Sequence, residues 1–301
     1  MIQNKNTNKI LITGATGFVG RHLIPQLINI YNNTEILTVN RNVEKAEILF
    51  KNLKCKHILS TDYKSIIEFN PDIVIHLATL STSRNDTEII KPMLEANIEF
   101  GVQLLSTLAK CDNMKLFVNV GSFAEYRSGT DKINDAYLYA ATKSAFRNFV
   151  EYYSHVAGFK YITAVPYSIY GNNDTAKKII DYIRESLSAK TPVKMTKGEQ
   201  TLDFIHVSDV VNFFVKVISN LQNIIDNMPN GADYHAGTGI GTTIRDLAKL
   251  IEKTENKKCN IEWGGLPYRQ MDVMQAIAPI EKNNILIDWK SKISIEEGIK
   301  L

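Results

Sequence analysis

Residues 9–20 read Lys9-Ile10-Leu11-Ile12-Thr13-Gly14-Ala15-Thr16-Gly17-Phe18-Val19-Gly20, an apolar run that leads into regularly spaced glycines. The run predicts a buried strand over Lys9–Thr13, and helical spacing follows over Arg21–Tyr31. Glycine suits a turn with unusual dihedral angles and a backbone that a ligand approaches closely. The N–H groups at a helix start attract phosphate. We therefore expect a strand–turn–helix that holds a dinucleotide diphosphate, through Gly14, Thr16, Gly17, Phe18 and Val19; a tight turn without a ligand is the alternative.

The same alternation of strand and helix continues through the first half of the chain. Apolar runs predict strands at Ile36–Val39, His57–Leu59, Ile73–Leu77, Leu116–Val120 and Tyr161–Val165. Helical spacing fills two of the intervals, Pro92–Lys110 and Tyr139–Val156. Alternating elements of this kind form right-handed crossovers and a parallel sheet covered on both faces. The predicted fold is an α/β, doubly wound parallel sheet (Rossmann).

The alternation of predicted strands and helices becomes less regular after Gly171. We expect a helix at Thr175–Ala189, a strand at Thr201–Val207 and irregular chain over Gly264–Ala278. A second helix is expected at Ser208–Asn220, with Ser208 or Asp209 as its N-cap. A third is expected at Ile244–Lys253, with Thr242 or Thr243 as its N-cap. This predicts a smaller, interleaved C-terminal substrate-binding domain. The expected division is residues 1–170 with a return segment at about 203–236, and residues 171–202 with 237–301 for the second domain.

Composition excludes several classes of protein. The chain has 301 residues, 44% hydrophobic and 22% charged, as in a globular protein. Its net charge of +3 favours neither nucleic acid nor membrane as a partner. Cys55, Cys111 and Cys259 form no zinc-binding pattern with histidine, so no metal is expected. With no signal-like N-terminus and no long apolar run, the expected location is cytoplasmic.

The end of the second strand bears on the choice of cofactor. It reads Val39-Asn40-Arg41, with no carboxylate to accept the 2′-hydroxyl of NAD and with an arginine where a 2′-phosphate would be met. We therefore expect NADP(H), with NAD(H) as the alternative. Asp62, after the third strand, is a candidate contact for adenine.

Tyr139 and Lys143 lie one helical turn apart on one face of the predicted helix. A nearby cation lowers the pKa of a phenol, which suits a general acid/base. Ser122 closes the strand Leu116–Val120, and the carboxyl ends of strands in such sheets are where ligands bind. We expect Ser122, Tyr139 and Lys143 to form one catalytic group.

With these motifs in place, the chain resembles the extended short-chain dehydrogenases/reductases, in the branch of nucleotide-sugar epimerases, dehydratases and reductases. The resemblance spans essentially the whole chain and rests on Gly14/Gly17/Gly20, Asp62, Ile75–Ala78, Asn97, Ser122, Tyr139/Lys143, Tyr170-Gly171, Gly198–Val210, Arg269, Asp288-Trp289 and Ile295–Ile299. It implies that Tyr139 exchanges a proton with the sugar, that Lys143 also holds the nicotinamide ribose, and that Ser122 orients the reacting oxygen. Further contacts implied for the cofactor are Leu77, Ala78, Thr79, Asn97 and Pro166. Those implied for the nucleotide sugar are Ser81, Ser83, Ser122, Ser168 and Arg269.

Departures from the family pattern narrow the reaction. Dehydratases of this family carry an Asp-Glu pair after the Ser/Thr, whereas this chain has Phe123-Ala124, with Glu125 one place too late. The resemblance therefore implies reduction of a 4-keto group on a nucleotide-linked 6-deoxy sugar, as in 4-ketoreductases of the CDP-abequose and CDP-paratose synthase type. A nucleotide-sugar 4-epimerase with bound NAD and an idle NADP-binding protein are the alternatives. The family's helix pairing implies a homodimer.

Overall fold

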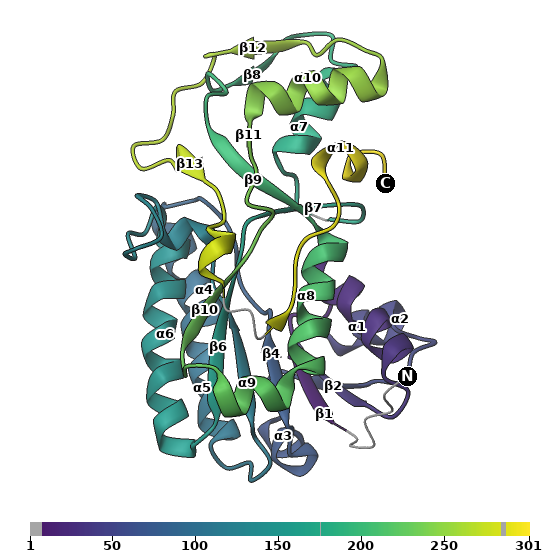
Figure 1. The fold of residues 1–301 in the computed structure, drawn as a ribbon, viewed down its shortest axis with the longest axis vertical. Helices are drawn as coiled ribbons and strands as arrows, with labels where there is room; N and C mark the ends of the chain where they lie inside the picture. The colour runs from purple at the N-terminus through teal and green to yellow at the C-terminus, as the bar shows by residue number, and fades with distance from the viewer. Residues whose placement is uncertain (1–7, 175, 284–286) are drawn as a thin grey trace.

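The computed structural model describes residues 8–174, 176–283 and 287–301. Its largest element is a seven-stranded sheet in the order β10-β6-β5-β4-β1-β2-β3 (Figure 1). All of its strand pairs are parallel. The strands are β1 Lys9–Thr13, β2 Glu35–Asn40, β3 Lys56–Leu59, β4 Ile73–His76, β5 Leu116–Val120, β6 Lys160–Pro166 and β10 Ala232–Ala236. The predicted α/β fold and its six predicted strands are confirmed, with ends shifted by a residue at most.

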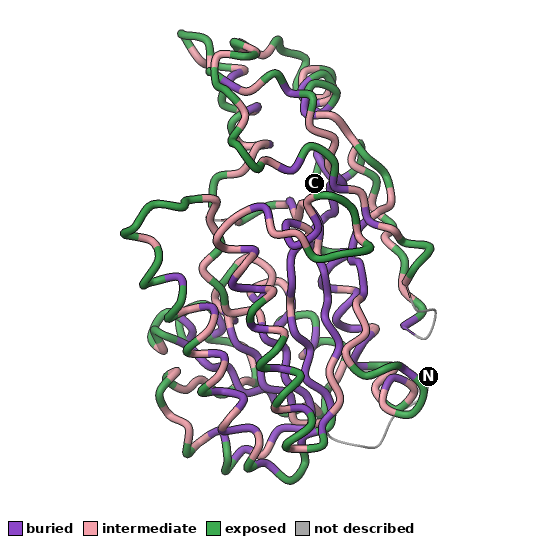
Figure 2. The backbone as a smooth tube through the Cα atoms, turned by 90° about the vertical axis from the view of Figure 1, so that its left-hand side faces the viewer, coloured by how far each residue is buried: buried purple, intermediate pink, exposed green. Residues whose placement is uncertain are grey.

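Helices cover both faces of this sheet, which explains the continuous apolar runs. Ile10 and Ile12 of β1 pack in one core cluster, whereas Leu11 between them packs in another on the opposite face. The first cluster includes side chains from α1 Phe18–Ile30, α2 Val43–Leu49, α8 Val207–Ser219 and α9 Leu221–Asn227. The second includes side chains from α3 Tyr63–Phe69, α5 Phe100–Leu108 and α6 Leu138–Ala157. Figure 2 shows the buried chain concentrated along the strands between these layers.

A smaller layer follows β6. Strands β7 Ser168–Tyr170, β9 Thr201–His206, β11 Gly241–Thr243 and β13 Gln275–Ala276 share one sheet, and β8 Val193–Met195 pairs with β12 Ile261–Trp263. Their cluster is completed by side chains from α7 Ile179–Ser186, α10 Ile244–Glu255 and α11 Ile295–Gly298. Figure 1 shows this layer at the top, beyond one end of the large sheet, and because β7 directly follows β6 that end carries the strands' carboxyl termini.

This arrangement bears on the expected domains. Helices α8 and α9 and strand β10 return to the large sheet, whereas β9 pairs with β7, β11 and β13. We retain as a proposal the division into residues 1–170 with about 203–236, and 171–202 with 237–301.

Several predicted helix boundaries are wrong for identifiable reasons. Helix α1 begins at Phe18 because Gly17 is its N-cap. The single helix expected over Pro92–Lys110 is three consecutive segments, α4 Thr87–Leu94, a π-helical turn Glu95–Glu99, and α5. Helix α7 covers only part of the expected Thr175–Ala189, whose first residue lies outside the described residues.

The caps of two later helices gave different outcomes. Neither Ser208 nor Asp209 caps α8; the N-cap is His206, whose ring accepts from Ser208 N. Thr243 is confirmed as the N-cap of α10, with Oγ1 accepting from Asp246 N at 3.0 Å. The stretch Gly264–Ala278 is irregular apart from β13.

In the part of the chain described, no helix has both the length and the apolarity to cross a bilayer.

Candidate active site

The glycine turn after β1 lies against the end of β4. Gly14 has a φ of +67°, and a Cβ there would lie 2.6 Å from Ala78 N. A Cβ on Gly20 would lie 2.5 Å from Ala15 O. Gly17 is the N-cap of α1 and has no side chain to bond the helix's first N–H groups. The turn therefore fits the diphosphate of a dinucleotide.

The ends of β2 and β3 place three of the expected cofactor contacts. Asn40 is buried, and its Nδ2 donates to Thr38 O at 3.0 Å and to Thr38 Oγ1 at 2.8 Å. Arg41 is exposed at the strand end. Asp62 is the N-cap of α3, where its carboxylate accepts from Ser65 N and Ser65 Oγ. Of these side chains, Arg41 is the one turned to solvent.

Asn97 holds the loop after β4 rather than facing open space. It is buried in the π-helical turn, and its Oδ1 accepts from Thr79 Oγ1 at 3.0 Å and from Leu80 N at 2.7 Å. Its Nδ2 donates to Leu80 O and to Thr142 Oγ1 of α6. The π-helical turn interrupts the expected helix, and Asn97 within it ties Thr79 and Leu80 to α6. Such turns are frequent at functional sites.

The three expected catalytic residues come from two neighbouring segments. Ser122 follows β5 and is the N-cap of the 3₁₀ turn Phe123–Glu125, with Oγ accepting from Ala124 N. Tyr139 and Lys143 lie in the first turns of α6. The Tyr139 hydroxyl interacts with the side chains of Ser81, Thr79 and Ser122. The structure thus brings these predicted residues together.

The pKa expected for Tyr139 is wrong. Burial raises it to about 12, assisted by the negative charge of Glu125, while the hydroxyls of Ser81, Thr79 and Ser122 act in the lowering direction. Burial also lowers the pKa of Lys143 to about 8. The desolvation of both groups outweighs the effect of a nearby ammonium. The neutral phenol is thus the form to expect at neutral pH.

A cavity of about 360 Å³ opens beside Tyr139. Of the predicted residues, Ser81, Ser122, Tyr139, Pro166 and Ser168 line it. Neither Ser83 nor Arg269 lines it; the side chain of Arg269 is 60% exposed and lies 3.7 Å from Asp272. The remaining wall is mostly apolar and was missed from the sequence, because its members are scattered along the chain: Phe123, Tyr167, Ile169, Tyr170, Ile179, Ile180 and Phe204, with Lys178.

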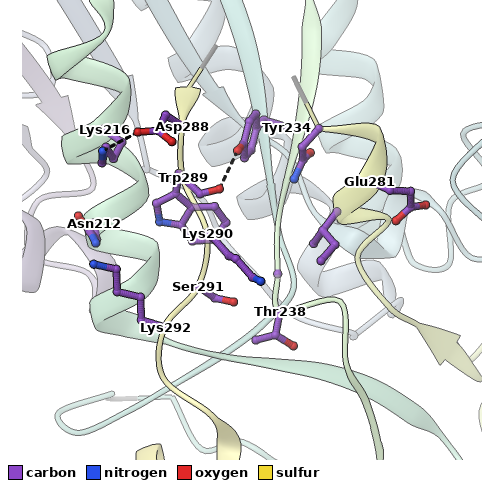
Figure 3. Close-up of a pocket in the computed structure, with 13 residues that line it drawn as sticks. Asn212, Lys216, Tyr234, Thr238, Glu281, Asp288, Trp289, Lys290, Ser291 and Lys292 are labelled. Atoms are coloured by element: carbon purple, nitrogen blue, oxygen red, sulfur yellow. Dashed lines mark hydrogen bonds and ion pairs between the residues drawn. The ribbon is translucent and has the colours of Figure 1, made fainter. Parts of the chain in front are cut away.

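A larger cavity, of about 710 Å³, lies between α8, β10 and the C-terminal segment (Figure 3). Lys216, Asp288 and Lys292 line it, and the first two form an exposed ion pair of 3.3 Å. None of the predicted site residues lines it. The chemistry is therefore concentrated at the smaller cavity beside Tyr139.

Glu125 is a buried group whose role the sequence did not reveal. Its side chain is fully buried, and Oε1 lies 2.7 Å from Arg147 Nε on α6. It is therefore not placed to give a proton to a sugar, in keeping with the absence of the dehydratase acid pair.

Residues 10–236 match the family described as NAD dependent epimerase/dehydratase family. CDP-abequose synthase of Yersinia pseudotuberculosis is 26% identical over 286 residues, covering 95% of this chain and 96% of the relative. GDP-L-colitose synthase of the same organism is 26% identical, covering 97% and 95%. Among solved structures, UDP-glucuronic acid 4-epimerase from Bacillus cereus in complex with UDP-glucuronic acid and NAD superposes with a TM-score of 0.84 at 20% identity, covering 97% of this chain and 96% of that one. The chain therefore belongs to the NAD dependent epimerase/dehydratase family.

Proposed function

We propose that this chain is an NAD(P)-dependent oxidoreductase that reduces the 4-keto group of a nucleotide-activated 6-deoxy sugar. The observation that carries the proposal is that Tyr139, Ser81 and Ser122 line the same cavity, where the Tyr139 hydroxyl interacts with both serine side chains. When bound, a reduced nicotinamide supplies the hydride that adds to the carbonyl carbon. Tyr139 donates its proton to the carbonyl oxygen, giving an alcohol, and Ser122 holds that oxygen.

Lys143 lies one turn from Tyr139 and is buried. We assign it the contact to the nicotinamide ribose and the support of the phenolate that proton transfer leaves behind. Gly14, Thr16, Gly17, Phe18 and Val19 are the proposed diphosphate contacts, and Leu77, Ala78, Thr79, Asn97 and Pro166 the proposed nicotinamide side of the site. Asp62 remains the proposed adenine contact.

The apolar cavity wall supports a deoxygenated sugar. Phe123 and Tyr167, which line the cavity with Tyr139, stack with ring centroids 5.9 Å apart. An apolar surface gains free energy by covering a methyl group, whereas a hydroxymethyl group would lose hydrogen bonds to water. Similarity to the CDP-abequose and GDP-L-colitose synthases supports the same substrate class. Ser81, Ser83, Ser168 and Arg269 are the proposed contacts of the nucleotide sugar.

We propose NADP(H) as the preferred cofactor, with NAD(H) as the alternative. The end of β2 offers no carboxylate, because residue 40 is an asparagine, whose amide is bonded to Thr38. Arg41 is exposed there. A guanidinium is well suited to a 2′-phosphate.

The test incubates the purified chain with nucleotide-linked 4-keto-6-deoxy sugars, carrying CDP, dTDP, GDP or UDP, and NADPH or NADH. The expected result is consumption of reduced cofactor in step with formation of the 4-hydroxy sugar, and its loss in Tyr139→Phe. No consumption with any of these sugars would contradict reduction.

A nucleotide-sugar 4-epimerase is the second candidate, favoured by 26% identity over 316 residues to a relative named putative UDP-glucose 4-epimerase of Methanocaldococcus jannaschii. It would use the same Ser122, Tyr139 and Lys143. An epimerase regenerates its cofactor, so NAD retained through purification and interconversion of sugars without net cofactor consumption would support it over the reductase.

We also propose a homodimer formed through α6 and residues 92–110, which comprise the end of α4, the π-helical turn and α5. Their exposed apolar side chains include Leu94, Phe149, Tyr152 and Val156. Sedimentation of the wild type and Tyr152→Asp tests this, with a dimer expected only for the wild type.

A cytoplasmic location is proposed because Cys55, Cys111 and Cys259 are free thiols.

A further inference from the structure

The 3₁₀ turn after Ser122 ends in a carboxylate that points back into the protein. Glu125 Oε2 accepts a hydrogen bond from Ser122 N at 2.6 Å, so the side chain closes a capping box around the proposed oxygen-holding residue. The side chain has no exposure to solvent. Burying a carboxylate costs free energy unless it is paired and hydrogen-bonded. The buried Glu125 side chain therefore depends on its partners for a stable charge.

The neighbouring glycine leaves space for this carboxylate. A Cβ on Gly121 would lie 2.4 Å from Glu125 Oε2 and 3.0 Å from Arg147 Nη2. The residue before Ser122 must therefore lack a side chain for the ion pair to reach the strand end. The backbone at the reacting serine and the ion pair are thus packed as one unit.

The partner cation stands on the helix that carries the other two reacting residues. Arg147 Nε lies 2.7 Å from Glu125 Oε1 and Arg147 Nη1 lies 2.6 Å from Asp233 of β10. Tyr139, Lys143 and Arg147 follow at intervals of four on α6, so they share a face of that helix. The Glu125–Arg147 pair therefore links the loop of Ser122 to the helix of Tyr139 and Lys143.

Other polar groups face this pair from several elements. Tyr126 hydrogen-bonds to Asp233, and its hydroxyl accepts from Arg147 Nη2 at 3.3 Å. Ser144 Oγ donates to Asp135 at 2.6 Å and lies 3.3 Å from Glu125 Oε1. The network is thus anchored on α6, β10 and the loop before α6, and each anchor restricts how Arg147 is placed.

We propose that Glu125 and Arg147 are positioning residues, which set Ser122 and the Tyr139–Lys143 face of α6 at the distance that the reaction needs. This rests on the proposed function for its activity readout. Neither residue lines the cavity, so neither touches the sugar. Replacing Glu125 or Arg147 should therefore lower turnover rather than weaken substrate binding, because small displacements of reacting groups reduce rates steeply.

The test compares three variants. In Glu125→Met/Arg147→Met both members of the pair are replaced by apolar groups of similar length, so neither Glu125 nor Arg147 is left buried without the other, while Asp233 loses Arg147 but keeps its hydrogen bond from Tyr126. Arg147→Lys keeps the charge but cannot bridge Glu125 and Asp233 as a planar fork does. The control is Asp72→Met/Lys115→Met, which removes a 2.7 Å ion pair in which Asp72 also accepts a backbone N–H, from Lys9, at the opposite end of the sheet.

We expect kcat to fall about tenfold or more in the double Met variant and about threefold in Arg147→Lys, with KM within about twofold of wild type in both. The control variant should keep the wild-type kcat. Wild-type kcat in a folded double Met variant would overturn the inference; if that variant does not fold, wild-type kcat in Arg147→Lys would do so.

A second readout separates this inference from the proposed function. Amide hydrogen exchange at Ser122, measured by NMR, should be faster in Arg147→Lys and in the double Met variant than in wild type and control. If no nucleotide sugar is turned over but Ser122 exchange responds in this way, the function fails and the positioning role stands. Unchanged exchange at Ser122 in both variants would overturn the positioning role, whatever the activity.

Discussion

Thr13 and His76, at the carboxyl ends of the paired strands β1 and β4, are joined by a 2.9 Å hydrogen bond between Thr13 Oγ1 and His76 Nδ1. Thr13 Oγ1 also accepts from Ala78 N at 3.1 Å. Because Thr13 Oγ1 accepts from Ala78 N, its own proton is available for donation to a neutral His76 ring. Together, the bonds to His76 and Ala78 hold the glycine turn against the loop that leads to Thr79. The proposed diphosphate and reaction sites are therefore mechanically connected.

His76 should make the protein sensitive to acid. Burial, with a contribution from Lys143, lowers the pKa of His76 to about 3 from a usual 6.5. Between these values the unfolded chain binds a proton that the native chain does not, so stability falls as pH decreases through that window. In His76→Phe, the decline in unfolding free energy should be less steep by about 1 kcal/mol per pH unit near pH 5–6.

Urea unfolding at several pH values measures that slope. His155→Phe, which makes the same substitution on the exposed surface of α6, provides the control variant. Part of the slope should persist in His76→Phe, because burial also lowers the pKa of His235, to about 4. An unaltered slope in His76→Phe would mean that His76 is not held neutral.

Gly14→Ala should disrupt the dinucleotide site. The residue has a left-handed φ of +67°, and the new Cβ would meet Ala78 N and Leu77 C at 2.6 Å. We expect a loss of about 2–4 kcal/mol in unfolding free energy, from strain and overpacking together, and much weaker cofactor binding by fluorescence titration.

Gly158→Ala is the matched control for that substitution. Its φ is +76°, but a Cβ there would meet nothing within 4 Å. It should cost only the conformational strain, about 1 kcal/mol, and leave cofactor affinity unchanged. Equal effects of the two substitutions would show that the turn is not specifically packed against the end of β4.

Lys143→Met should abolish turnover while stabilising the fold. Burial lowers the pKa of Lys143 from 10.5 to about 8. At neutral pH, holding the buried ammonium charged therefore destabilises the native state. Because the unfolded chain binds more protons between these values, stability rises with pH through the window in the wild type. The variant should gain about 1–3 kcal/mol at neutral pH and lose this dependence. Reduced stability in urea unfolding would contradict a charge held at a cost.

Arg41→Ala should separate the two cofactors. If Arg41 meets the 2′-phosphate, the variant's KM for NADPH should rise about tenfold or more, while the KM for NADH stays constant. Steady-state rates with both cofactors give the comparison. Equal effects on the two values would remove Arg41 from cofactor discrimination.

Much of the large sheet could be predicted from the sequence, because strands buried on both faces give continuous apolar runs such as Leu116–Val120. The sequence also predicted that Tyr139 and Lys143 share a helix face, since they are separated by one helical turn, and both lie on α6. The cap of α8 was not, because a histidine side chain is an uncommon N-cap. Asp209, which with Ser208 was an expected cap, accepts from Lys292 N and Ile293 N, far away in the chain.

The pKa values could not be predicted from spacing at all. The tyrosine–lysine interval suggests a lowered phenol pKa, but desolvation depends on what surrounds both groups. Glu125 illustrates the same limit, because its partner Arg147 is fixed by the packing of α6 against the 3₁₀ turn and not by any local pattern.

The most direct test follows the hydride. NADPH deuterated at the transferring position is incubated with a nucleotide-linked 4-keto-6-deoxy sugar that the chain accepts, and the product is examined by NMR. Our proposal predicts deuterium at C4 of the sugar with wild type and none with Tyr139→Phe. Product free of deuterium at C4, or full labelling by Tyr139→Phe at the wild-type rate, would contradict it.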